Sequence, residues 1–185
     1  MIDLTTLPSK LAPITTESAP ITIERIGSQH VKPLCESGCS AAETVKPWLG
    51  STLCPTNPSA AKQCIEQFEH ARQSGYGIAY LPMYEGKCLG MGIVNYIHPI
   101  HRVANLGYWI APQACGQGLG SLLCDRLISL AKNHLNLVRL ELFIEPANIA
   151  SIKLAQRIGA AKEGLCRKRV FGRDAYLYSL LLDND

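Results

Sequence analysis

Apolar and polar positions repeat along this chain with two periods, one typical of strands and one typical of helices. Alternation near period two, or a short apolar run between turn residues, predicts strands at seven places: residues 21–26, 76–84, 88–97, 106–111, 138–145, 161–171 and 175–182. A period near 3.6 predicts helices at four places: around 41–49, and at 60–73, 119–134 and 148–158. The order β-α-α-β-β-β-α-β-α-β-β indicates an α/β or α+β fold around a mixed sheet.

Turn-forming residues mark several boundaries of these elements. Asn57-Pro58-Ser59 is typical of a helix start with proline in the first turn, and Gly159 is typical of the residue after a helix end. Residues 1–20 are rich in Thr, Ser and Pro, and we expect them to form an irregular arm on the surface. We therefore expect one domain over residues 21–185, with a mixed sheet of about seven strands and about four helices.

The composition agrees with a globular domain. Of the 185 residues, 47% are hydrophobic and 18% are charged, which differs from the composition of disordered chains. A net charge of +3 does not by itself predict nucleic-acid binding. No apolar run approaches the roughly 20 residues of a membrane span, and residues 1–20 lack the basic start and apolar stretch of a signal peptide. We expect a cytoplasmic protein with no membrane partner and no direct nucleic-acid partner.

Eight cysteines are numerous for a chain of this length. They stand at positions 35, 39, 54, 64, 88, 115, 124 and 166 and form no Cys-x-x-Cys pair. The five histidines show no companion spacing for zinc. We therefore expect no metal site, and small buried thiols in a reducing compartment.

The stretch CGQGLGSLL, residues 115–123, places three glycines directly before the predicted helix 119–134. The unpaired N–H groups and the positive dipole end of a helix start attract phosphate, and glycines leave those N–H groups accessible. No Lys follows as in a phosphate-binding P-loop, and the glycines lack the spacing of a dinucleotide-binding loop. A plain strand-to-helix turn with small packing residues remains the alternative explanation of this segment.

Four ordered motifs resemble one enzyme superfamily. LGYWIAP (106–112) followed by CGQGLG (115–120) resembles the central motif of the GNAT acetyltransferases, whose loop pattern is Gln/Arg-x-x-Gly-x-Gly/Ala. EPANIAS (145–151) and IGAAKEG (158–164) resemble a run found in the Rim-type branch, which acetylates the N-termini of ribosomal proteins. The similarity covers residues 75–182 well and is looser over 21–74, where Pro47-Trp48-Leu49 is the best match.

The resemblance implies a GNAT fold, acetyl-CoA as co-substrate, and a specific set of site residues. In that family the loop holds the pyrophosphate of acetyl-CoA, while the preceding strand binds the pantetheine arm and polarises the thioester carbonyl. Ser151 would protonate the leaving thiolate or cap its helix, and Tyr108 would supply a main-chain N–H as oxyanion donor. The co-substrate would contact Tyr108, Trp109, Ile110, Cys115, Gly116, Gln117, Gly118, Leu119, Gly120, Ser121 and Asn148.

Several positions depart from the family pattern. Cys115 stands where Arg or Gln is usual, although Gln113 gives a second possible register, and Ala160 replaces a usual Phe. Asn105 stands where related enzymes often carry a Glu that acts as general base, and Asn cannot accept a proton. Glu145, His98 and His101 are the remaining candidates for that role. Because an α-amine loses its proton far more easily than a lysine side chain does, a site without a strong base suits an N-terminal α-amine.

The sequence therefore predicts an acyltransferase that moves an acetyl group from acetyl-CoA to a primary amine, most simply the N-terminal α-amine of a protein. A small acceptor, such as an amino acid, a polyamine or an antibiotic, is the alternative within enzymes. A non-catalytic CoA-binding module is the alternative outside them. The basic residues Arg167, Lys168, Arg169 and Arg173 would line the acceptor side or form a solvated hairpin face. Association into a homodimer stays open.

Overall fold

The structure is a computed structural model that describes residues 2–15 and 19–182, and one mixed sheet runs through it. The sheet has nine strands in the order β1-β2-β3-β5-β6-β7-β9-β8, with β4 paired to β3. Their bounds are β1 (Lys10–Ile14), β2 (Ile21–Arg25), β3 (Gly77–Tyr84), β4 (Lys87–Cys88), β5 (Gly90–His98), β6 (Val103–Ile110), β7 (Arg139–Ile144), β8 (Ala161–Val170) and β9 (Arg173–Leu181). Every neighbouring pair is antiparallel except β6 and β7.

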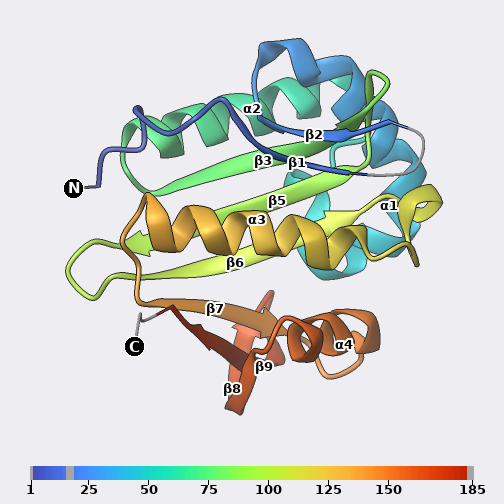
Figure 1. Ribbon diagram of the computed structural model, residues 1–185. Helices are drawn as coiled ribbons and strands as arrows, with labels where there is room; N and C mark the ends of the chain where they lie inside the picture. The colour runs from blue at the N-terminus through green and yellow to red at the C-terminus, as the bar shows by residue number, and fades with distance from the viewer. Residues whose placement is uncertain (1, 16–18, 183–185) are drawn as a thin grey trace.

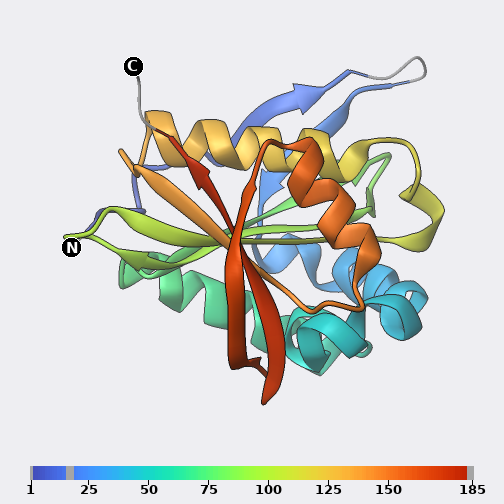
Figure 2. The ribbon, with the colours of Figure 1, turned by 90° about the horizontal axis from the view of Figure 1, so that it is seen from below.

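Helices cover both faces of this sheet (Figures 1 and 2). The helices α3 (Leu119–Asn133) and α4 (Ile149–Arg157) lie on one face, and α1 (Val31–Leu53) and α2 (Pro58–Gln73) lie on the other. The β8–β9 hairpin crosses to the side of α1, as Figure 2 shows. Within residues 2–15 and 19–182, no helix combines the length and the apolar character needed to cross a membrane.

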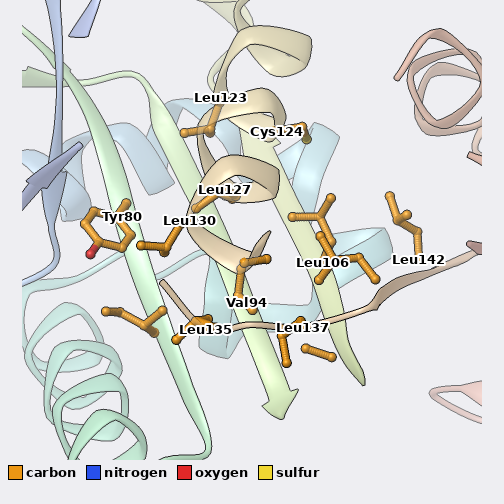
Figure 3. Close-up of a cluster of buried hydrophobic side chains, with 14 of the residues drawn as sticks. Tyr80, Val94, Leu106, Leu123, Cys124, Leu127, Leu130, Leu135, Leu137 and Leu142 are labelled. Carbon is orange, nitrogen blue, oxygen red and sulfur yellow. The ribbon is translucent and has the colours of Figure 1, made fainter. Parts of the chain in front are cut away.

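Two apolar clusters fill the space between the sheet and its helices. Leu123, Leu127 and Leu130 of α3 are fully buried against Tyr80 and Val94 of the sheet (Figure 3). The second cluster packs α1 and α2 against the opposite face. Because β3 and β5 are covered on both faces, their sequences are nearly continuous apolar runs rather than alternating patterns.

The predicted fold class, a mixed α/β sheet with about four helices, is confirmed, and the strand count is nine instead of about seven. One added strand, β4, splits from the predicted strand 88–97. The other, β1, lies within residues 1–20, which we expected to be irregular. Its neighbourhood carries Leu4, Leu7 and Ile14, all buried in the α3-side cluster. Pro13 suits a strand at the edge of the sheet, where it has no second neighbour to bond.

The helix α1 also differs from the expectation of short helical pieces around residues 41–49. It runs from Val31 to Leu53 and is broken at Gly50, whose φ is 73°. Pro33 lies in its first turn, where a missing N–H costs little, and Pro47 lies inside it near the break. These residues resemble loop punctuation in the sequence, although burial of Leu34, Ala41 and Val45 keeps the segment helical.

The pairing of β6 with β7 is short and leaves a gap in the sheet. The parallel ladder joins Val103–Asn105 to Arg139–Glu141 and ends there. Beyond it, residues 106–110 of β6 and 142–144 of β7 continue as strands without each other as partners. Figure 1 shows β7 turning away from β6 over this stretch.

Candidate active site

A cavity of about 680 Å³ opens at the gap between β6 and β7. It passes from the start of α3 and α4 on one face to the end of α1 on the other. Twenty-nine residues line it. The helical face contributes chiefly Gly116, Gly118, Gly120, Ser121, Asn148, Ser151, Lys153 and Arg157. The opposite face contributes Thr44, Val45, Trp48, Leu49, Asn105, Phe143, Glu145 and Val170.

The register of β6 directs alternate main-chain groups into this gap. The N–H of Ala111 donates to Leu89 O at 2.8 Å, on the side of β5. Because successive residues of a strand turn their N–H and C=O groups to opposite sides, Tyr108 and Ile110 direct theirs toward β7. The ladder with β7 ends before these residues. Main-chain donors and acceptors of Tyr108 and Ile110 therefore face the cavity.

The glycine loop precedes α3 and lines one end of the cavity. Gly116 and Gly118 have φ of 78° and 77°, the left-handed region that only glycine enters at little cost. Leu122 N–H bonds back to Gly118 O at 3.2 Å, so the N–H groups of Leu119, Gly120 and Ser121 precede the first intrahelical bond. The helix start therefore presents a set of backbone donors at its positive end.

Gly120 has a different reason for being glycine. A Cβ atom placed there would lie 2.8 Å from Leu154 Cδ1 and 3.5 Å from Tyr108 Cε2, whereas at Gly118 it would meet nothing within 4 Å. Gly118 therefore shapes the loop, and Gly120 lets α3 approach α4 and β6. Next to it, the Ser121 hydroxyl is buried and has no hydrogen-bond partner among the described residues. This orphaned hydroxyl belongs to the cavity lining.

Tyr108 and Ser151 meet inside the cavity. The Tyr108 hydroxyl donates to Ser151 Oγ at 3.2 Å, and burial raises the pKa of Tyr108 to about 12. The phenol thus stays protonated at neutral pH and keeps donating, which leaves the hydrogen of Ser151 free to point elsewhere. Asn148 caps α4, since its Oδ1 accepts from Ser151 N–H at 3.1 Å. The capping role proposed as an alternative for Ser151 therefore falls to Asn148.

Side chains from distant segments build the other end. Arg173 of β9 donates to Glu145 Oε1 at 2.7 Å and to the Pro47 carbonyl of α1 at 2.7 Å. This guanidinium holds together the end of β7, the hairpin and the last turns of α1. Glu145 is only 11% exposed and is the one carboxylate among the described lining residues, which include no histidine. The Asn105 side chain donates to Asn95 Oδ1 at 2.9 Å.

The cavity brings together eleven of the twelve site residues that the sequence predicted: Tyr108, Trp109, Ile110, Cys115, Gly116, Gly118, Leu119, Gly120, Ser121, Asn148 and Ser151. Gln117 differs, because its side chain is exposed at the loop tip and it does not belong to the lining. Of the three leftover base candidates, Glu145 lines the cavity. His98 and His101 stack on each other, 4.2 Å between ring centroids, in the exposed turn between β5 and β6.

Comparison with protein families decides the class. Residues 21–161 match the family described as "Acetyltransferase (GNAT) domain". The chain belongs to the GNAT acetyltransferase family. It is therefore an acyltransferase, and the predicted family, fold class and enzyme class are confirmed. The similarity also reaches the less well matched region before residue 75.

Relatives of this GNAT chain carry Rim-type names. It is 26% identical over 175 residues to the ribosomal-protein-serine acetyltransferase of Escherichia coli, covering 90% of this chain and 96% of that protein. The structure of Mycobacterium smegmatis RimJ in complex with CoA-disulfide has a TM-score of 0.86 at 16% identity, over 98% of this chain and 90% of that one. A RimL ribosomal L7/L12 acetyltransferase with coenzyme A has a TM-score of 0.82 at 21% identity, over 94% and 100%. These two likenesses show the fold.

Sequence reasoning missed much of the cavity's far end. It assigned no role to Thr44, Val45 and Leu142–Ile144, all of which line the cavity. The match at Pro47-Trp48-Leu49 was a usable signal, because Trp48 and Leu49 lie in the lining. Lys153 and Arg157 were also detectable. They stand four positions apart and therefore lie on the same side of the predicted helix 148–158.

Proposed function

We propose that this GNAT chain transfers an acetyl group from acetyl-CoA to the N-terminal α-amine of a protein. The observation that carries the proposal is the cavity at the β6–β7 gap, lined by the glycine loop before α3 at one end and by side chains of α1, β7 and β8 at the other. Such a passage suits two substrates that approach a shared point from opposite faces. Holding donor and amine together there supplies much of the rate acceleration.

The chemistry of the first end fits the polar part of acetyl-CoA. Bare N–H groups at the start of α3 suit a pyrophosphate, and the buried Ser121 hydroxyl lacks the partner that such an anion would provide. Lys153 and Arg157 line the same region, and neither forms an ion pair within the described residues. Their positive charges suit the phosphates as well. The binding set is the predicted one without the side chain of Gln117.

The reaction itself needs few protein groups. The acceptor nitrogen attacks the thioester carbon, and the Tyr108 N–H stabilises the oxygen that becomes negative. The carbon–sulfur bond then breaks, the sulfur leaves with its electron pair, and the nitrogen loses one proton to water. Ser151 donates a hydrogen bond to the departing sulfur, which finally takes up a proton as the free thiol. Tyr108 Oη fixes the orientation of Ser151 by occupying one of its lone pairs.

The missing general base supports an α-amine acceptor. Glu145, the one carboxylate in the described lining, is already held by Arg173 at 2.7 Å. At pH 7.4 about a quarter of α-amines are neutral, against about a thousandth of lysine side chains, because their pKa values are about 7.7–8.0 and 10.4. An enzyme without a strong base is therefore expected to act on the α-amine, which has the larger neutral fraction at this pH. The Rim-type names of its relatives agree with a protein N-terminus.

Steady-state acetylation of an acceptor panel tests the proposal. The purified chain with acetyl-CoA is offered peptides with free N-termini, the same peptides with blocked N-termini and one lysine, and free amino acids and polyamines. We expect turnover with the free N-termini alone. Faster turnover of polyamines or amino acids would favour the small-molecule alternative, and binding of acetyl-CoA without turnover of any acceptor would favour a binding module. We further propose a cytoplasmic location, where the eight cysteines would stay reduced.

A further inference from the structure

The β8–β9 hairpin carries more positive than negative charge next to the end of the cavity lined by Trp48, Glu145 and Val170, here called the acceptor end. Its basic residues near the tip are Arg167, Lys168, Arg169 and Arg173, and Lys162 lies near the start of β8. Two of the neighbouring acids are already engaged: Glu145 pairs with Arg173, and Asp174 accepts from the Lys168 main-chain N–H at 2.9 Å. Glu163, at the far end of β8, pairs with Arg139. The hairpin tip therefore has cationic side chains without acidic partners.

Arg169 is the one of these cations that is both fixed in place and free to bind. Its guanidinium carbon lies 3.8 Å from the centroid of the Phe143 ring. Stacking on an aromatic face holds the guanidinium plane and leaves its N–H edge open. Arg169 has neither an ion pair nor a hydrogen bond within the described residues, and its side chain is exposed. Phe143, which lies under the guanidinium, and Val170, the next residue in the chain, both line the cavity.

From this placement we infer a carboxylate-binding position at Arg169, and with it a preference for acceptor N-termini that carry Asp or Glu within the first few residues after the acetylated one. The inference rests on the proposed function and names the acceptors of that same site. An open guanidinium edge matches a carboxylate in a two-pronged hydrogen-bonded pair.

The position of Arg169 on the rim favours a peptide over a free amino acid. In a free α-amino acid the carboxylate carbon is only two bonds from the amine nitrogen. This carboxylate would therefore lie deep in the cavity, beside the reacting atoms. Arg169 instead lies outside the lining, above Phe143. A carboxylate that reaches it belongs to a ligand that extends from the cavity to the surface, as a peptide chain does.

The size of the effect follows from the exposure of the pair. Exposed ion pairs contribute little, and a fixed, two-pronged pair lies near the upper end of their range, so we expect about a fivefold preference in kcat/KM. The preference should appear mainly in KM, because the carboxylate is remote from the bond-making atoms. Added salt should weaken it, since the pair is solvent-exposed.

The test compares three peptides of equal length, Ser-Ala-Ala, Ser-Asp-Asp and Ser-Lys-Lys at their N-termini, with the wild type, Arg169→Gln and Arg167→Gln. Arg167→Gln is the matched control, because it removes the same charge two residues away without touching Phe143. We expect the acidic peptide to be preferred by the wild type and the control, and the preference to vanish in Arg169→Gln. Phe143→Leu keeps the charge but removes the ring beneath it, and should lose part of the preference.

Three outcomes count against the inference. Equal kcat/KM for the three peptides in the wild type would overturn it and leave the proposed function standing. If the preference for the acidic peptide falls as much in Arg167→Gln as in Arg169→Gln, the preference comes from the total charge of the hairpin and not from Arg169. No acetylation of any peptide, or faster acetylation of free aspartate than of the acidic peptide, would overturn the proposed function and this inference together.

Discussion

The two ends of the cavity are built by different means. The end at the start of α3, here called the donor end, consists of consecutive residues whose main-chain N–H groups we propose to bind acetyl-CoA, and whose glycines set the loop shape and the approach of the helices. The acceptor end consists of side chains from α1, β7 and the β8–β9 hairpin, joined by Arg173. A main-chain site is insensitive to most side-chain changes, whereas a side-chain site can change its ligand with one substitution. The donor end thus suits a co-substrate that is always acetyl-CoA, and the acceptor end suits selection among different amine acceptors.

The largest expected effect comes from the point where the two ends meet. Ser151→Ala should lower kcat about 100-fold, the loss typical of one well-placed hydrogen-bond donor to a developing charge. The KM for acetyl-CoA should change little. Stability should fall by about 1 kcal/mol, because Asn148 still caps α4 but the Tyr108 hydroxyl loses its acceptor. Steady-state kinetics with the preferred peptide measure both constants. Ser129→Ala, an exposed serine on α3, is the control; unchanged kcat in Ser151→Ala would remove Ser151 from the reaction.

The two glycines Gly118 and Gly120 of the donor end should respond differently to substitution, because Gly118 shapes the loop and Gly120 allows a close approach of α3 to α4 and β6. Gly120→Val places a side chain against Leu154 and Tyr108, so we expect a loss of about 2 kcal/mol of stability, or about 4–8 °C in Tm. Gly118→Ala meets no neighbour but strains a φ of 77°, and should cost about 1 kcal/mol. Both should raise the KM for acetyl-CoA. A Gly118→Ala protein less stable than Gly120→Val, by thermal unfolding, would contradict this division.

A substitution at the acceptor end should weaken binding of the peptide without changing binding of acetyl-CoA. Arg173→Gln removes the partner of Glu145 and the donor to the Pro47 carbonyl, so the hairpin and the end of α1 lose their common anchor. We expect the KM for the peptide to rise about fivefold, equivalent to about 1 kcal/mol for a partly exposed pair. The KM for acetyl-CoA should stay constant, as it should in the control Arg167→Gln. Parallel changes in both KM values would show that the two ends are not independent.

The smallest expected effect lies outside both ends, in the ion pair of Arg139 with Glu163. Hydrogen bonds from Arg139, and then from Ser179, lower the pKa of Glu163 to about 2. Because the folded pKa lies below its ordinary value of 4.5, the stability that Glu163 contributes is present above pH 4.5 and is lost as pH falls toward 2. Urea midpoints of the wild type and Glu163→Gln should therefore differ at pH 7, and the difference should shrink below pH 4.5 and vanish only as the pH reaches about 2. A constant difference would contradict the assignment, and neither KM should change at pH 7.

The same contrast explains what could be predicted from the sequence. The donor end was predictable because its signal is local: spaced glycines before a helix with a clear apolar stripe, and Asn148 and Ser151 three residues apart. The main-chain role proposed for the loop also fits the position of Gln117, whose side chain is exposed and lies outside the cavity lining. The strand patterns could not predict the gap between β6 and β7, because they carry no information on where a ladder ends.

The acceptor end was not predictable because its contacts join residues far apart in sequence. Arg173 is 126 residues from Pro47 and 28 from Glu145, and no periodic pattern encodes such a meeting. The helix α1 was hidden by Pro33, Pro47 and Gly50, which are typical of loops when tertiary burial is unknown. Strand β1 was hidden in the same way by a Pro-rich and Thr-rich composition. In each case packing overrode the local preference.

Acetylation of an α-amine without a strong base can be tested directly by competition between two amines of one peptide. A single peptide with a free N-terminal serine and one internal lysine is incubated with the enzyme and acetyl-CoA from pH 6.5 to 9, and mass spectrometry locates the acetyl group. We expect acetylation at the N-terminus throughout, with kcat/KM rising until the pH passes the α-amine pKa of about 7.7–8.0. Acetylation of the lysine at a comparable rate at pH 7 would contradict it.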